Sequence, residues 1–288
     1  MSAPPTVRRM AGTPTARRIR DNLVGLGGVV ERNVYLVRRY VWWEFAFLLW
    51  TAANSLTVVL IAKGIEAAGG RLDVNRQTTI LLIGAVVWAY LGIIFEILTE
   101  TVAWERWEGT IEYTFMAPLS RPVHLLGMGV FAISYGILRA GLLFGLLAWV
   151  FRLDMPHANF VAAFGVLGVA SVSFIGIGMM TAVLPLISPE KGTQLGFIAQ
   201  GIMLAISGVY YSVDVLPGPL RAMATWSPAT YALEGMRAAV LQGKGLAEMG
   251  AMLWPLAAFG VVCVPLGLLV FRAGEQYAKR HGKLKRSG

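Results

Sequence analysis

The chain is poor in charge and nearly free of cysteine. Charged residues make up 14% of its 288 residues and hydrophobic residues 56%, and the apolar residues form long blocks rather than alternating with polar ones. This composition excludes a soluble globular protein and indicates a membrane protein. Cys263 is the only cysteine, which excludes an intrachain disulfide, a CxxC redox pair and a cysteine-rich metal site.

Motifs of nucleotide hydrolysis and catalysis are also missing. No GxxxxGK[ST] phosphate loop occurs in the sequence. His124, His157 and His281 show no HExxH spacing, and no serine lies in a GxSxG-like setting. We therefore expect no catalytic residue, no metal and no cofactor in this chain.

The net charge of +9 comes largely from the two ends of the chain. Eight Lys and Arg precede residue 43 and six follow residue 271. Residues 1–20 hold five arginines and no apolar run, so we expect no cleaved signal peptide. Basic residues beside apolar blocks mark the cytoplasmic side and attract anionic lipids. We expect a multi-pass protein of the cell (inner) membrane with both termini in the cytoplasm, contacts with anionic lipids, and no nucleic-acid partner.

Six apolar blocks are long enough to cross a bilayer. A hydrocarbon core about 30 Å thick needs roughly 20 residues at about 1.5 Å per residue. The blocks predict an all-α integral membrane fold with six transmembrane helices over residues 43–271 and a basic cytoplasmic tail over 272–288. The third and fourth blocks are overlong, so we expect them to tilt or to bend at positions such as Pro185. The predicted spans are Trp43–Ala62, Thr78–Leu98, Val123–Phe151, Ala158–Ile187, Leu195–Val213 and Ala251–Phe271.

Residues 1–42 predict a basic tail followed by an amphipathic helix. Apolar residues recur there every three or four positions, with charged residues between them. We expect this helix to lie on the inner leaflet; the alternative is a soluble helix packed on another cytoplasmic element. The apolar positions are Leu23, Leu26, Val30, Val34, Val37 and Val41.

The segment between the second and third predicted spans is unusually acidic and aromatic for a cytoplasmic loop. It reads TETVAWERWEGTIEYTFMAPLSRPVH. Trp104, Trp107, Ile111 and Phe115 recur on one helical face, and Pro118 ends the pattern. We predict a cytoplasmic helix over about 100–118 that docks on a partner; the alternative is an interfacial helix with its aromatic rings among lipid headgroups.

The segment between the fifth and sixth spans holds apolar pieces too short to cross a bilayer. It reads SGVYYSVDVLPGPLRAMATWSPATYALEGMRAAVLQGKGLAEMG, interrupted by Pro and Gly. Irregular backbone is tolerated at membrane depth only where protein covers it or a wet cavity adjoins it. We predict outer re-entrant helices over about 214–248 that cap a pathway.

Two stretches, EGTIEYTFMAPLSR and SGVYYSVDVLPGPLRAMATWSPATYALEGMRAAVL, resemble the signature regions of the ABC type-2 transporter permease family. Span count, order and loop lengths resemble that family over the whole chain. The resemblance implies a coupling helix, an outer cap, two copies of a separate cytoplasmic ABC ATPase subunit that holds ATP and Mg, and a second permease copy or paralogue. The matching coupling positions are Trp104, Glu105, Glu108, Gly109, Glu112, Phe115 and Pro118, and those of the outer cap are Pro217, Pro228 and Arg237.

Arg139 is the most unusual residue within a predicted span. It lies about fifteen residues into the third span, where a lone guanidinium costs at least about 2.5 kcal/mol. Glu44 and Glu96 fall near the cytoplasmic ends of their predicted spans, so neither matches its depth. Arg139 therefore either faces a hydrated pathway or a dimer seam, or is satisfied by carbonyls and hydroxyls such as that of Ser134. The polar candidates for a pathway are Asn54, Glu96 and Arg139.

These features together predict the permease subunit of an ATP-driven ABC exporter, without an ATPase site of its own. Drug-like or amphiphilic molecules are the expected substrates. The alternatives are a lipid-linked glycan exporter subunit, a secondary carrier and a membrane lipid enzyme.

Overall fold

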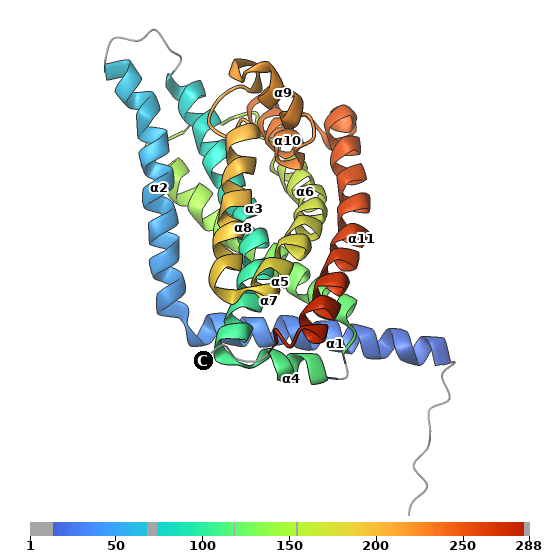
Figure 1. Cartoon of the computed structure of the whole chain (residues 1–288). Coiled ribbons are helices and arrows are strands. Elements are labelled where there is room, and N and C mark those ends of the chain that lie inside the picture. Colours follow the sequence, from blue (N-terminus) through green and yellow to red (C-terminus); the bar gives the residue numbers. More distant parts are fainter. Residues whose placement is uncertain (1–13, 68–73, 118, 154, 285–288) are drawn as a thin grey trace, which may run out of the picture.

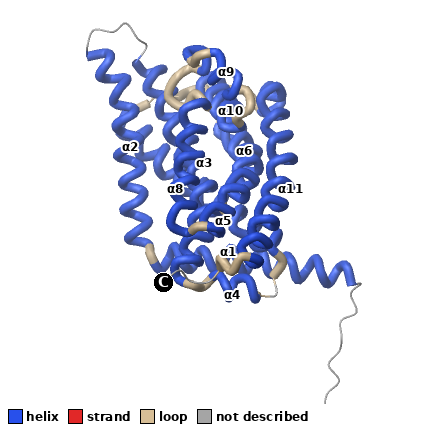
Figure 2. The backbone as a smooth tube through the Cα atoms, in the orientation of Figure 1, coloured by secondary structure: helices blue, strands red, loops and turns tan. Residues whose placement is uncertain are grey.

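A computed structural model describes residues 14–67, 74–117, 119–153 and 155–284, and these are almost entirely helical (Figure 2). The helices follow one another without a strand among the described residues. They are α1 Pro14–Arg39, α2 Val41–Ala67, α3 Val74–Glu108, α4 Ile111–Met116, α5 Arg121–Phe151, α6 Phe160–Thr181, α7 Val183–Ile187, α8 Pro189–Ile206, α9 Gly218–Ala224, α10 Pro228–Gln242 and α11 Gly250–Arg280, with the 3-10 helices η1 Val213–Val215 and η2 Leu246–Met249.

Five segments in the described residues are long and apolar enough to cross a membrane. They correspond to the first, second, third, fourth and sixth spans predicted from the sequence, which confirms an all-helical, multi-pass membrane protein. Their bounds are Val41–Ile61, Arg76–Glu108, Arg121–Phe151, Phe160–Ile187 and Leu246–Arg280.

The fifth predicted span, Leu195–Val213, has the wrong bounds. Its helix, α8, begins at Pro189 and ends at Ile206. Gly208, with φ of 68°, turns the chain directly after it. The first turn of α8 also contains Glu190 and Lys191, which lowers its average hydropathy. α8 nevertheless runs along the bundle beside α3 and α7 (Figure 1), so a sixth crossing remains a prediction.

The helices form a bundle with two distinct ends (Figure 1). At one end, which we call the α4 end, α1 lies across the bundle beside α4 and the last turns of α11. The short helices α9 and α10 cover the opposite end. α3 is the central element, because 72% of its most apolar stretch is buried inside the bundle. For α2 the buried share of the most apolar stretch is 17%. α2 therefore stands at the edge, against α3 and α5.

The closest packing in the bundle is between α6 and α11. A Cβ atom on Gly176 would lie 2.3 Å from the backbone carbon of Cys263, and one on Gly267 would lie 2.5 Å from the carbonyl oxygen of Gly176. Glycine lets the two backbones approach each other, as is common between membrane helices. Cys263 is half-buried at this contact.

Both overlong spans behave as expected. The fourth breaks between α6 and α7 at Ala182, because Pro185 has no N–H to donate to the carbonyl of Thr181 and its ring crowds that carbonyl. The third is one continuous helix, α5, that crosses the bundle obliquely (Figure 1). Its first turns contact α1, and Arg139 farther along reaches α2.

α1 is helical as predicted, but its packing face is rotated from the predicted apolar stripe. Val29 and Asn33 are buried, and a Cβ atom on Gly127 of α5 would lie 2.9 Å from Val29. Leu23 and Val34 of the predicted stripe stay exposed. The helix therefore packs on the bundle and still presents an apolar surface outward.

At the α4 end two helices continue beyond the spans predicted from the sequence. α3 continues ten residues past Leu98, to Glu108, and α11 continues past Phe271 to Arg280. These last turns carry charged residues, so they do not belong to the apolar blocks from which the spans were predicted. The region 272–288, predicted as a tail, thus begins as helix.

Candidate functional site

The predicted cytoplasmic helix over 100–118 is two helices. α3 runs to Glu108, the chain turns at Gly109 with φ of 74°, and α4 begins at Ile111. Only glycine adopts this left-handed backbone readily. The expected common face is therefore divided, since Trp104 and Trp107 are exposed on α3 whereas Ile111 is buried.

An exposed surface forms where α3 ends and α4 follows, and we call it the docking surface. It combines large apolar side chains with two carboxylates. Tyr113 and Met116 are 75% and 78% exposed. Exposed apolar patches of this kind mark contacts with a protein or a membrane. Its members are Trp104, Trp107, Glu108, Glu112, Tyr113 and Met116.

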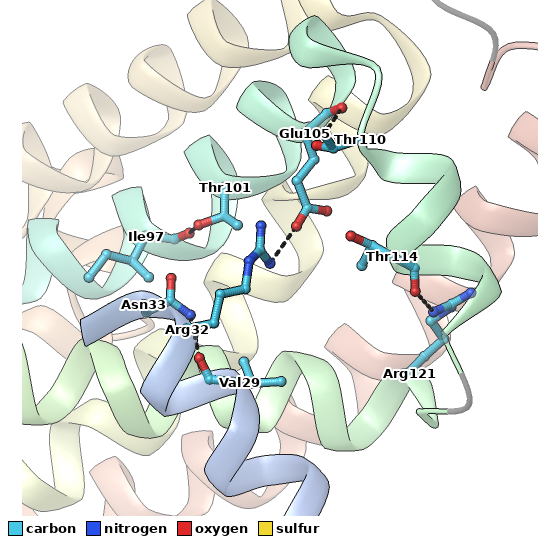
Figure 3. Close-up of polar contacts among 9 residues, drawn as sticks. All are labelled: Val29, Arg32, Asn33, Ile97, Thr101, Glu105, Thr110, Thr114 and Arg121. Atoms are coloured by element: carbon cyan, nitrogen blue, oxygen red, sulfur yellow. Dashed lines mark hydrogen bonds and ion pairs between the residues drawn. The ribbon is translucent and has the colours of Figure 1, made fainter. Parts of the chain in front are cut away.

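Arg121 fixes α4 to the rest of the bundle. One terminal nitrogen donates to the carbonyl oxygen of Thr114 at 3.1 Å (Figure 3). The other donates to the carbonyl oxygen of Phe115 at 2.7 Å, so Arg121 caps the carboxyl end of α4. Its Nε pairs with Glu275 of α11 at 3.2 Å, and its guanidinium lies over the Phe115 ring, 4.1 Å from the centroid. Lys279 pairs with the same carboxylate at 2.6 Å.

A second ion pair connects the end of α3 to α1. Arg32 donates to Glu105 at 2.7 Å (Figure 3), and the Glu105 side chain is only 4% exposed. A buried carboxylate needs such a partner, because leaving it unpaired is costly. Glu105 therefore faces α1 rather than the docking surface.

The residues predicted to couple to a partner thus divide into three groups. Trp104, Glu108 and Glu112 are exposed on the docking surface, and Gly109 forms the turn beside it. Glu105 and Phe115 form internal contacts. Pro118 lies outside the described residues.

A cleft with a volume of about 770 Å³ opens between α2, α3, α5 and α8. It brings together all three polar candidates from the sequence, Asn54, Glu96 and Arg139. Asn54 itself donates to the carbonyl of Trp50 in its own helix, at 2.9 Å. Its carbonyl group is left as the part that can face a ligand.

Arg139 has a carboxylate partner, contrary to the sequence expectation. Its Nη1 lies 3.8 Å from Glu44, and its Nη2 donates to the hydroxyl of Thr51 at 3.4 Å. Tyr135 donates to the same Glu44 carboxylate. Ser134, the suggested hydroxyl partner, donates to Val130 instead. The depth predicted for Arg139 from its position in the span was wrong, because α5 begins at the level of α1 and runs obliquely to α2.

Glu96 and Glu100 lie on the same wall of the cleft, one helical turn apart. Glu96 is twelve residues from the end of α3, or about 18 Å at about 1.5 Å per residue. It was expected to lie near the end of its helix, and it does not. No hydrogen bond or ion pair joins either carboxylate to another part of the chain that the structure describes. Among the described residues no three His, Cys, Asp or Glu gather to hold a metal ion.

The segment predicted as an outer cap contains two short helices, α9 and α10, of which α10 is largely buried. Pro217 precedes α9 and Pro228 begins α10, as suits a residue that cannot donate an N–H. Arg237 donates to the carbonyls of Gly208 and Val209, both at 3.0 Å. Burial lowers the pKa of Arg237, and nearby Glu234 opposes that shift. Arg237 therefore fastens α10 to the turn after α8.

Sequence reasoning missed the residues that make long-range contacts. Arg32, Arg121, Tyr135 and Glu275 were not singled out. A charged residue beside a predicted helix end, such as Arg121 three residues after Pro118, was the signal that could have indicated such a contact. Its partner could not be identified, because a contact across 154 positions leaves no local pattern in the sequence.

The chain is similar to known membrane permeases. The profile of the family described as "ABC-2 type transporter" matches residues 36–241. The linearmycin resistance permease protein LnrN of Bacillus subtilis (strain 168) is 23% identical over 190 residues, which cover 64% of this chain. The chain spans about half the length of that curated relative, 49%. Because the family profile covers well over half of the sequence, the chain belongs to the ABC-2 type transporter permease family.

Proposed function

We propose that this chain is the membrane subunit of an ATP-driven exporter, in which a separate ABC ATPase docks at the α4 end. Two ATPase copies and a second permease, either the same chain or a paralogue, complete the assembly. ATP and Mg belong to the ATPase subunits. Family membership supports the ATPase partnership.

The observation that carries this proposal is the continuity of α3. Its last two turns contribute Trp104, Trp107 and Glu108 to the docking surface. Glu96, Glu100 and Trp104 itself, all on the same uninterrupted helix, line the cleft. A helix transmits a displacement along its length because every turn is hydrogen-bonded to the next. Movement of an ATPase against the last turns of α3 would therefore reach the cleft.

Two ion pairs between helices at the α4 end distribute that movement. Arg121 joins α4 to α11, and Glu105 joins α3 to α1. The turn at Gly109 separates α4 from α3 and gives α4 a place to pivot. We propose that closure of the ATPase subunits rotates α4 and changes the access of the cleft, releasing substrate toward α9 and α10.

Charge supports placing the α4 end in the cytoplasm. The basic residues of α1 and of the last turns of α11 lie there, and Lys and Arg accumulate on the cytoplasmic side of membrane proteins. The exposed apolar side chains of α1 then face the inner leaflet, and its arginines meet anionic lipids.

Drug-like amphiphiles are the substrate class we favour. The curated relative is named as a resistance permease for linearmycin, and the cleft combines apolar and polar walls. A lipid-linked glycan exporter is the second candidate, and both require the same coupling.

Affinity purification of the tagged chain from its native host in mild detergent, followed by mass spectrometry and an ATPase assay, tests this function. We expect a roughly stoichiometric ABC ATPase to co-purify. Glu108→Lys reverses a charge on the docking surface without touching an internal contact, so we expect it to insert normally and to lower ATPase activity at least several-fold. Glu31→Gln, exposed on α1, serves as the control. A preparation without any ATPase, or Glu108→Lys with wild-type activity, contradicts the proposal.

A further inference from the structure

Carboxyl groups outnumber basic groups on the walls of the cleft. Glu44, Glu96 and Glu100 line it, whereas Arg139 is the basic side chain among its lining residues. Arg139 pairs with Glu44 and also acts electrostatically on Glu96, without forming an ion pair with it. Two carboxylates thus remain without a matching cation in this region of the chain.

The same walls present several large aromatic rings. Trp50 comes from α2, Trp88 from α3 and Phe197 from α8. Rings offer apolar area, and their faces attract cations within about 6 Å. A ligand with a cationic centre and a bulky apolar body would meet complementary groups on both kinds of wall.

Other ligand classes fit this lining less well. An anion would face two unpaired carboxylates, and Arg139 already serves Glu44 and Thr51. A bare metal ion lacks a cluster of three suitable ligands among the described residues. A neutral amphiphile would supply no counter-charge to either Glu96 or Glu100, whereas a cation would.

We propose that this cleft selects lipophilic cations, with Glu96 and Glu100 as the residues that recognise the positive charge. The inference rests on the proposed function and specifies its substrate class. It assigns the apolar body of the ligand to the aromatic walls, and the charge to one turn of α3.

Tetraphenylphosphonium and tetraphenylborate test the inference, because they have nearly the same shape and opposite charge. Binding of each is measured by equilibrium dialysis to the full chain in phosphatidylcholine nanodiscs, with empty nanodiscs subtracted. We expect saturable binding of tetraphenylphosphonium and none of tetraphenylborate. We expect the double variant Glu96→Gln, Glu100→Gln to bind the cation at least tenfold more weakly, and each single variant to show part of that loss.

Glu31→Gln removes an exposed carboxylate outside the cleft and serves as the matched control, with wild-type binding expected. Size-exclusion chromatography establishes that each variant folds; if the double variant does not, the single variants decide. Wild-type binding of tetraphenylphosphonium by the carboxamide variants overturns the inference. So does equal saturable binding of both probes, or the absence of saturable cation binding.

This assay contains no ATPase, so its result is separate from that of the coupling experiment. A complex that couples to an ATPase but binds no cation would retain the proposed function and refute the charge selection. Charge-dependent binding by a chain that recruits no ATPase would do the reverse.

Discussion

The two charged regions of the molecule differ in how their charges are satisfied. At the α4 end, Arg32 pairs with Glu105, and Arg121 and Lys279 share Glu275. In the cleft, Glu96 and Glu100 lack such partners among the described residues. Paired charges hold helices in one arrangement, whereas unpaired charges attract a ligand. We therefore interpret the first region as a transmission device and the second as a recognition site.

The largest expected effect comes from breaking the clamp on α4. Arg121→Ala removes two hydrogen bonds to α4, an ion pair to α11 and a ring contact. Hydrogen bonds to a charged group contribute about 1.5–3 kcal/mol each. We expect the ATPase activity of the purified complex to fall at least about tenfold, with tetraphenylphosphonium binding unchanged.

Arg272→Ala is the control for that variant, because Arg272 is an exposed arginine on the same part of α11. We expect it to retain wild-type ATPase activity. An Arg121→Ala complex as active as the wild type would show that the clamp transmits nothing.

A smaller effect is expected from straining the backbone of the turn between α3 and α4. Gly109→Ala places a Cβ on a residue with φ of 74°, which costs about 1–2 kcal/mol. We expect a lower melting temperature by intrinsic-fluorescence thermal unfolding. Gly141→Ala is the matched control, since Gly141 lies within α5 with no atom within 4 Å of its added Cβ. There alanine is expected to be neutral or slightly stabilising, and equal losses at both glycines would contradict the assigned turn.

The smallest expected effect comes from removing the positive charge of Arg139 in the cleft. Arg139→Gln releases Glu44 from its ion pair and adds negative charge to the wall. We expect tetraphenylphosphonium to bind about two- to threefold more tightly, or about 0.4–0.7 kcal/mol. Arg139→Lys keeps the charge and is expected to match the wild type. Weaker cation binding by Arg139→Gln would mean that Arg139 maintains the shape of the cleft rather than opposing the positive charge of the ligand.

Apolar blocks predicted the spans well because burial in hydrocarbon leaves a strong compositional signal. The break near Pro185 was predictable for a local reason, the missing N–H. α8 was misplaced because Glu190 and Lys191 open its first turn, and α3 was cut short because its last turns carry charges.

The partners of individual side chains were not predictable. Arg139 was expected to lack a carboxylate at its depth, but the oblique course of α5 brings it to Glu44. Glu105 was expected to face a partner protein, yet it turns inward to Arg32. Both outcomes depend on helix tilt and rotation, which neighbouring helices set and which leave no spacing pattern in the sequence.

Photo-crosslinking of the docking surface tests the central claim most directly. A benzophenone amino acid replaces Tyr113 on α4, and in a second variant it replaces Trp226 at the opposite end; the two native side chains are 75% and 77% exposed. The account predicts that irradiation of the complex purified from its native host joins position 113, and not position 226, to an ABC ATPase subunit. Crosslinks to an ATPase from neither position, or only from position 226, would contradict it.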